Sequence, residues 1–104
     1  ERDDVRSVRV MVVDDEALAR QVAVEYLGAC DGVEVIAECA NGYEAVKAVS
    51  EAVPDVLLLD VQMPKLSGFD VLELIGPGPA VIFATAHDDY ALKAFEVHAV
   101  DYLL

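Results

Sequence analysis

The sequence predicts an α/β fold in which helices cover both faces of a parallel sheet. Short apolar runs alternate with amphipathic stretches about five times along the chain, as strands and crossover helices do in such sheets. Hydrophobic residues make up 56% of the 104 residues, a share that suits a sheet buried on both sides. This length is enough for one compact domain and too short for two.

Five apolar runs are the expected strands, and their patterns indicate where they lie in the sheet. The run at residues 56–59 is continuously apolar, which favours a central strand. The run at residues 33–38 alternates partly with polar residues, as an edge strand with one solvated face does. The other three runs lie at residues 8–13, 80–84 and 100–104.

The first predicted helix carries apolar side chains at helical spacing. Leu18, Val22 and Tyr26 recur at positions i, i+4 and i+8. We expect this stripe to face the sheet, and Arg20 and Glu25 to face solvent.

Capping residues and helix breakers delimit the later helices. Asn41 is the expected N-cap of the second helix, with Glu44 completing a capping box, and Pro54 ends the helix. Ser67 can cap a third, short helix that stops at the Gly-Pro repeat of residues 76–79. The expected inward residues are Ala45, Val46, Val49 and Val53 in the second helix, Val71, Leu72 and Ile75 in the third, and Leu92 and Phe95 in a fourth that begins at Asp88 or Asp89.

Acidic residues follow the strands that this topology brings together. Five parallel strands suit a flavodoxin-like, doubly wound sheet of order 2-1-3-4-5 better than a barrel or a full dinucleotide-binding fold. In that order the first and third strands are neighbours, and ligands bind at their carboxyl ends. Asp14 and Asp15 follow the first strand, Asp60 ends the third and Thr85 follows the fourth. All four are therefore expected at one edge of the sheet.

Three carboxylates this close favour a bound cation. Each raises the proton affinity of the others unless a cation joins them. Oxygen ligands in a small site suit Mg²⁺, which retains several of its water ligands. A single aspartate at a strand end is more often a helix cap or turn residue, so the prediction depends on the set of Asp14, Asp15 and Asp60.

Composition excludes several functions. The formal net charge of −13 argues against direct nucleic-acid binding by this segment. No apolar run reaches the ~18 residues of a membrane span, and no signal-peptide pattern occurs. Cys30 and Cys39 lack metal-ligand spacing, so we interpret them as buried thiols of a reducing cytoplasm.

Three segments resemble the signatures of response-regulator receiver domains of two-component systems. They are Val12-Val13-Asp14-Asp15-Glu16, then Leu59-Asp60-Val61-Gln62-Met63-Pro64 with Ser67-Gly68, and lastly Ala84-Thr85-Ala86. Their order and spacing match over essentially the whole chain. Residues 87–96 and 100–104 further resemble receivers of the LytTR subfamily, which usually precede a β-rich DNA-binding domain that regulates transcription.

The resemblance implies that Asp60 is the phosphoacceptor, taking a phosphoryl group from a phosphohistidine of a sensor histidine kinase. It also implies Mg²⁺ binding by the carboxylates of Asp15 and Asp60 and the backbone carbonyl of Gln62, with Asp14 acting through water. A carboxylate is a competent nucleophile, and phosphoryl transfer needs mainly positioning and charge neutralisation. Receivers are signalling phosphoacceptors rather than enzymes, although they self-phosphorylate and dephosphorylate with Mg²⁺.

The same resemblance assigns four supporting residues. Thr85 would bind a phosphoryl oxygen, and Tyr102 would change rotamer as Thr85 moves. Gln62 and His87 would be rim residues that tune how fast the phosphoryl group hydrolyses. Simpler roles stay open, because strands favour aromatic core residues such as Tyr102 and loops are polar at positions such as His87.

The family pattern extends beyond the last residue of this sequence. It places a lysine directly after the fifth strand and a final helix beyond, whereas the sequence ends at Leu104. We therefore expect residues 1–104 to be a receiver truncated after strand 5, with the output domain absent. The sheet face beside the first helix would lose cover, which makes a homodimer possible.

Three other functions remain to be distinguished. A dehalogenase-type phosphatase also uses an aspartate nucleophile, but it needs Asp-x-Asp after the first strand, where this chain has Asp14-Asp15. An interaction module of the same fold would not need Asp60 and Thr85. A nucleotide-binding flavodoxin-like protein would carry a Gly-rich loop after the first strand, which this sequence lacks.

Overall fold

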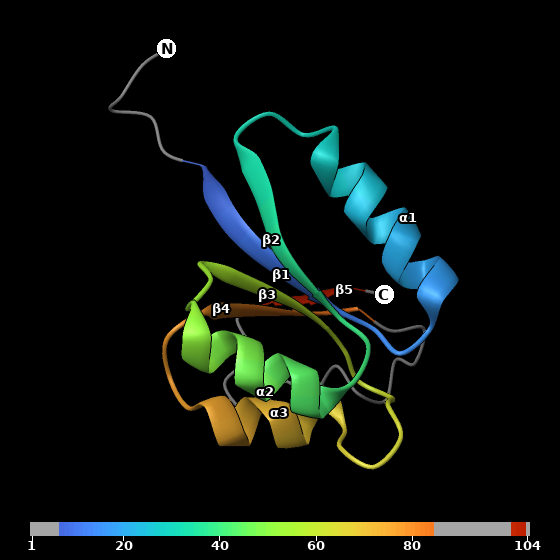
Figure 1. The fold of residues 1–104 in the computed structure, drawn as a ribbon, viewed down its shortest axis with the longest axis vertical. Helices are drawn as coiled ribbons and strands as arrows, with labels where there is room; N and C mark the ends of the chain where they lie inside the picture. The colour runs from blue at the N-terminus through green and yellow to red at the C-terminus, as the bar shows by residue number, and fades with distance from the viewer. Residues whose placement is uncertain (1–6, 85–100, 104) are drawn as a thin grey trace.

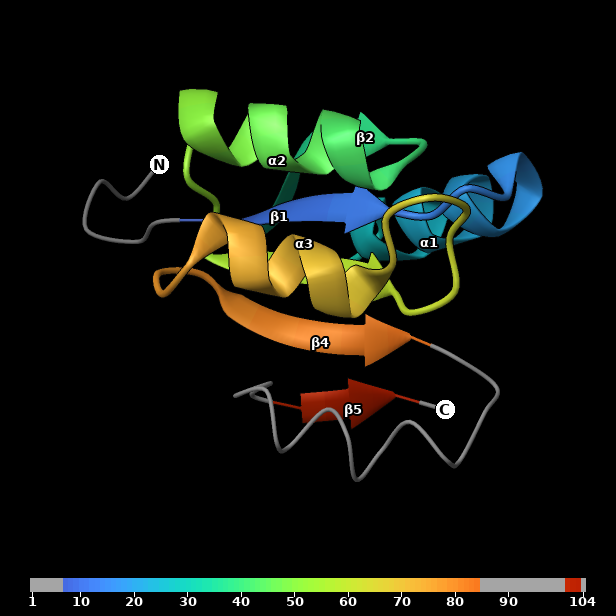
Figure 2. The same ribbon diagram turned by 90° about the horizontal axis from the view of Figure 1, so that it is seen from below.

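The computed structural model describes residues 7–84 and 101–103, the last three by their backbone. Five parallel strands form one sheet in the order β2-β1-β3-β4-β5 (Figure 1), which matches the expected order. The strands are β1 (Val8–Val13), β2 (Val33–Cys39), β3 (Val56–Asp60), β4 (Ala80–Ala84) and β5 (Asp101–Leu103). Figure 2 shows β5 beside β4 at the edge of the sheet.

Three helices connect the described strands and lie on both sides of the sheet. They are α1 (Ala17–Gly28), α2 (Gly42–Glu51) and α3 (Gly68–Ile75). In Figure 1, α1 lies on one side, and α2 and α3 lie together on the other. No helix within the described residues is long and apolar enough to cross a membrane.

The main core lies between the sheet and the pair α2 and α3. Alternate residues of the central strands point to this side, because successive side chains of a strand point to opposite faces. The buried cluster consists of Met11, Val13, Cys39, Ala45, Val49, Leu57, Leu59, Val61, Met63, Val71, Val81 and Phe83. Burial of this apolar surface is the main favourable term for folding. It also fixes the carboxyl ends of β1 and β3.

The other face of the sheet is poorly covered, as the sequence analysis expects. None of the residues of α1, all of which are described, is buried. Leu18, Val22 and Tyr26 face the sheet as predicted, but the sheet does not bury them, and they are 69%, 57% and 72% exposed. The physical reason is that α1 packs over β2 and β1, and its apolar stripe lines a groove of about 730 Å³ between α1 and the sheet.

The predicted caps occur, with one shift. The Asn41 side chain accepts a hydrogen bond of 2.9 Å from the Glu44 N–H, whereas Glu44 Oε1 accepts from the Ala40 N–H, one residue earlier than a capping box requires. Ser67 and Asp70 form a complete capping box at α3. Val53 is 55% exposed rather than buried, because α2 ends at Glu51 and the chain has left the helical stripe.

Several predicted features lie outside the described residues. These are the fourth helix with Leu92 and Phe95, the residues Thr85 and His87, and the side chain of Tyr102.

Candidate functional site

The pairing of β1 with β3 places three aspartates at one edge of the sheet. Val13 of β1 is the register partner of Leu59 of β3. Asp14 and Asp60 each come one residue later, so they lie at the same level of the two neighbouring strands. Asp60, the last residue of β3, pairs in turn with Ala84 of β4. The buried β1 and β3 residues that precede them hold both strand ends in place.

The carboxylates of Asp14, Asp15 and Asp60 converge. One oxygen from each lies within 4.8 Å of the others. Asp14 and Asp60 are half-buried, and Asp15 is exposed. The structure therefore brings together the three carboxylates that the sequence predicts as metal ligands.

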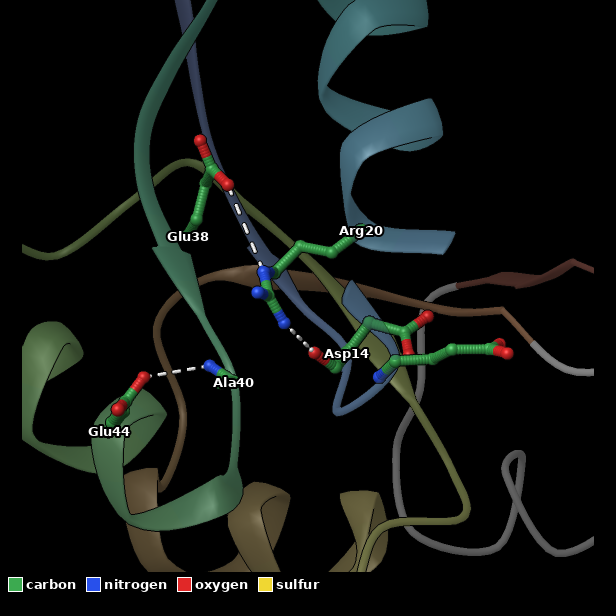
Figure 3. Close-up of polar contacts among 6 residues, drawn as sticks. Asp14, Arg20, Glu38, Ala40 and Glu44 are labelled. Carbon is green, nitrogen blue, oxygen red and sulfur yellow. Dashed lines mark hydrogen bonds and ion pairs between the residues drawn. The ribbon is translucent and has the colours of Figure 1, made fainter. Parts of the chain in front are cut away.

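Asp14 is held at several atoms. Its N–H donates to the Cys39 carbonyl at 3.0 Å, which extends the β1–β2 ladder. Its Oδ1 accepts a 2.9 Å hydrogen bond from the Glu16 N–H, which starts α1. Its carbonyl accepts a 2.7 Å hydrogen bond from Arg20 Nη1 (Figure 3).

Arg20 was expected to face solvent, and this prediction is wrong. Its side chain is 20% exposed, and its Nε lies 3.8 Å from Glu38 Oε1 on β2. The only sequence signal for its contact with Asp14 is that Arg20 lies in the first turn of the helix that follows the aspartates. A solvent-facing arginine would have the same spacing, so the pattern alone could not reveal the contact.

Asp60 has an unusual affinity for protons. Burial raises the pKa of its carboxyl from 3.8 to about 7, and the negative charges of Asp14 and Asp15 add to the effect. A hydrogen bond of 3.3 Å from the Gln62 N–H works in the opposite direction. A cation among the three carboxylates would relieve this repulsion.

The loop after Asp60 is tightly folded. Lys65 has a φ of 72°, and the Leu66 N–H donates to the Pro64 carbonyl at 2.7 Å, as in a γ-turn. A Cβ atom at Gly68 would overlap the Asp60 carbonyl oxygen, so α3 can start against the end of β3 only with glycine there. Gln62 lies exposed on this loop, two residues after Asp60.

The donor set fits a hard divalent cation. All side-chain donors are carboxylate oxygens, and Mg²⁺ prefers one or two carboxylates with water and phosphate oxygens. Asp15 is exposed, which leaves room for water ligands and an incoming group. Thr85 and His87, expected beside this site, lie outside the described residues.

Comparisons with known proteins agree with this geometry. The model of the response regulator receiver domain family matches residues 10–104. The transcriptional regulatory protein BtsR of Salmonella typhi is 48% identical to this chain over 99 residues, and that of Escherichia coli K12 is 46% identical. In both cases the match covers 93% of this chain and 41% of the relative.

Two solved structures have the same fold. The response regulator domain of Thermotoga maritima CheB has a TM-score of 0.86 at 32% identity, covering 94% of this chain and 78% of that one. The signal receiver domain of Mycobacterium tuberculosis NarL has a TM-score of 0.85 at 33% identity, covering 95% and 84%.

Proposed function

Because this chain belongs to the response-regulator receiver domains, we propose that Asp60 accepts a phosphoryl group from a phosphohistidine of a sensor histidine kinase. The observation that carries the proposal is the convergence of Asp60 with Asp14 and Asp15 within 4.8 Å at the end of a central strand. The family consists of signalling phosphoacceptors, which favours this function over an aspartate-nucleophile phosphatase.

The transfer is a displacement at phosphorus. An oxygen of the Asp60 carboxylate forms a bond to phosphorus while the phosphorus–nitrogen bond to the donor imidazole breaks. The imidazole nitrogen leaves with the electron pair and takes up a proton. Asp60 must be ionised to attack, so its raised pKa means that relief of the repulsion from Asp14 and Asp15 also activates the nucleophile.

We propose that Asp14, Asp15 and Asp60 hold Mg²⁺, together with the backbone carbonyl of Gln62. When bound, the cation would neutralise charge on the phosphoryl oxygens. Asp14 is suited to hold a water ligand, since one of its oxygens already accepts the Glu16 N–H.

The remaining roles are proposals by family resemblance. Thr85 and Tyr102 would pass the phosphorylated state to the rest of the domain, and Gln62 and His87 would tune the lifetime of the phosphoryl group. Gln62 is consistent with a rim position, since it is exposed two residues after Asp60.

We also propose that this segment works within a longer transcriptional regulator in the cytoplasm. The chain spans about two-fifths of the curated relatives that it matches, which are named transcriptional regulatory proteins. The resemblance of residues 87–96 and 100–104 to LytTR receivers supports a DNA-binding LytTR output domain in that longer protein. Residues 1–104 would then belong to its phosphoacceptor domain.

Intact-mass spectrometry tests the phosphoacceptor directly. After incubation with Mg²⁺ and acetyl phosphate, we expect a mass increase of one phosphoryl group. Chelation of the metal with EDTA should prevent it. Asp60→Asn preserves the shape of the side chain and should abolish the adduct, and an adduct of unchanged yield in that variant would contradict the assignment.

A further inference from the structure

Arg20 joins the aspartate-bearing turn to the neighbouring strand. Its Nη1 donates a 2.7 Å hydrogen bond to the Asp14 carbonyl, and its Nε lies 3.8 Å from Glu38 Oε1. Figure 3 shows the guanidinium between Glu38 on β2 and the end of β1 at Asp14. With a side chain only 20% exposed, Arg20 is ordered by these contacts rather than extended into solvent.

The carbonyl that Arg20 holds belongs to the peptide group between Asp14 and Asp15. A peptide group is planar, so fixing its oxygen also fixes the direction in which the chain enters Asp15. The Asp14 N–H and the Asp14 carboxylate are held separately, by Cys39 and Glu16. Arg20 therefore contacts the part of the turn that relates one carboxylate to the next.

We propose that Arg20 is a positioning residue for the cation site. Through the Asp14 carbonyl, it orients the peptide group between Asp14 and Asp15 and so sets their carboxylates relative to Asp60. This inference rests on the proposed function, because it takes the three aspartates as metal ligands. Glu38 in turn positions the guanidinium from β2.

The chemistry of arginine suits this role. A hydrogen bond from a charged donor is stronger than a neutral one, and the rigid fork of a guanidinium can engage two partners at once. Partners that orient metal ligands without binding the metal typically contribute 10–100-fold to its affinity.

Arg9 provides a matched control at the opposite end of β1. Its Nη1 donates a 2.8 Å hydrogen bond to the Val53 carbonyl, so it also ties a backbone oxygen to the sheet. Replacing either arginine with methionine keeps most of the aliphatic stem and removes the donors. Only the Arg20 contact lies beside the aspartates.

The experiment measures Mg²⁺ affinity by isothermal titration calorimetry and the stability of the metal-free chain by urea unfolding in EDTA. We expect Arg20→Met to weaken Mg²⁺ binding by about tenfold or more, by analogy with other partners of metal ligands. Arg9→Met should retain the parental affinity for Mg²⁺, even if it loses as much unfolding free energy as Arg20→Met does. Arg20→Lys keeps one charged donor and should recover part of the affinity.

Three outcomes overturn the inference, and they have different meanings. An affinity in Arg20→Met equal to that of Arg9→Met shows that Arg20 only stabilises the fold. A parent chain that binds no Mg²⁺ overturns the metal site itself, and the positioning role with it. If Arg20→Met does not fold, Arg20→Lys decides. Lysine lacks the rigid fork of the guanidinium, so we expect roughly threefold weaker binding or more. The parental affinity in Arg20→Lys contradicts the role.

Discussion

At the scale of single residues, the carboxyl group of Asp60 connects stability with chemistry. Its pKa of about 7 in the folded chain lies above its ordinary value of 3.8, because burial and two neighbouring carboxylates disfavour the charged form. The folded state thus binds this proton more tightly than the unfolded state. The resulting stabilisation is fully present below about pH 4 and is lost as the pH rises through 7.

Asp60→Asn should therefore stabilise the metal-free chain at high pH. We expect a gain in unfolding free energy of about 1–2 kcal/mol at pH 8. Conversion of the whole pKa shift at ~1.4 kcal/mol per pKa unit would give a larger figure, but solvent reaches this site and screens the repulsion. The gain should shrink as the pH falls towards 4. Urea unfolding in EDTA at pH 4.5 and pH 8 measures it, and a difference between parent and variant that does not change with pH would contradict this origin.

At the scale of elements, the junction between β3 and α3 fixes Asp60. Gly68 starts α3 and donates its N–H to the Val61 carbonyl at 2.9 Å. An added Cβ would overlap the Asp60 carbonyl oxygen and lie 3.1 Å from the Val61 Cα. Both neighbours are backbone atoms, so they can yield only if the strand end or the helix moves.

Gly68→Ala should accordingly cost about 1–3 kcal/mol of unfolding free energy, the usual cost of overpacking. It should also lower the yield of phosphoryl adduct, because the strand end carrying Asp60 shifts. Gly28→Ala is the control: within the described structure nothing lies within 4 Å of its added Cβ. That variant should stay within ~1 kcal/mol of the parent, and equal losses for the two substitutions would count against the junction.

The sequence predicts elements better than it predicts their surroundings. All five strands and the caps Asn41 and Ser67 could be predicted, because apolar runs and capping residues act locally. The exposure of the stripe containing Val22 could not be predicted, because helical periodicity identifies an apolar face without showing how much of it the sheet covers. Arg20 was missed because its hydrogen bond depends on the path of the turn after β1.

In the aspartate site, too, the sequence predicts which residues meet but not the environment that they create. The convergence of the three carboxylates follows from strand order alone, so Asp14, Asp15 and Asp60 could be predicted together. The proton affinity of Asp60 depends on burial and on distances to its neighbours, which spacing along the chain does not give. Roles for Thr85, His87 and Tyr102 stay predictions.

At the scale of the whole molecule, the two faces of the sheet differ. One is closed by α2 and α3, and the other carries the groove beside α1 with Leu18, Val22 and Tyr26 exposed along it. Contiguous exposed apolar surface of a few hundred Å² normally marks an association site. This asymmetry supports the homodimer expected from the sequence.

We predict that the 104-residue chain forms dimers or larger species through this stripe. Val22→Lys places a charge at its centre and should return the chain to a monomer. Tyr43→Lys changes a residue of α2 that is 61% exposed on the other side and should not. Light scattering at high concentration measures all three, and a strictly monomeric parent would refute the prediction.

The central claim is that Asp60, among the three clustered aspartates, carries the phosphoryl group. An aspartyl phosphate is reduced by borohydride to homoserine, which marks the modified residue permanently. After Mg²⁺ and acetyl phosphate treatment, reduction and proteolysis, peptide mass spectrometry should find homoserine at position 60 and unmodified aspartate at positions 14 and 15. Homoserine at position 14 or 15, or at none of the three, would contradict the account.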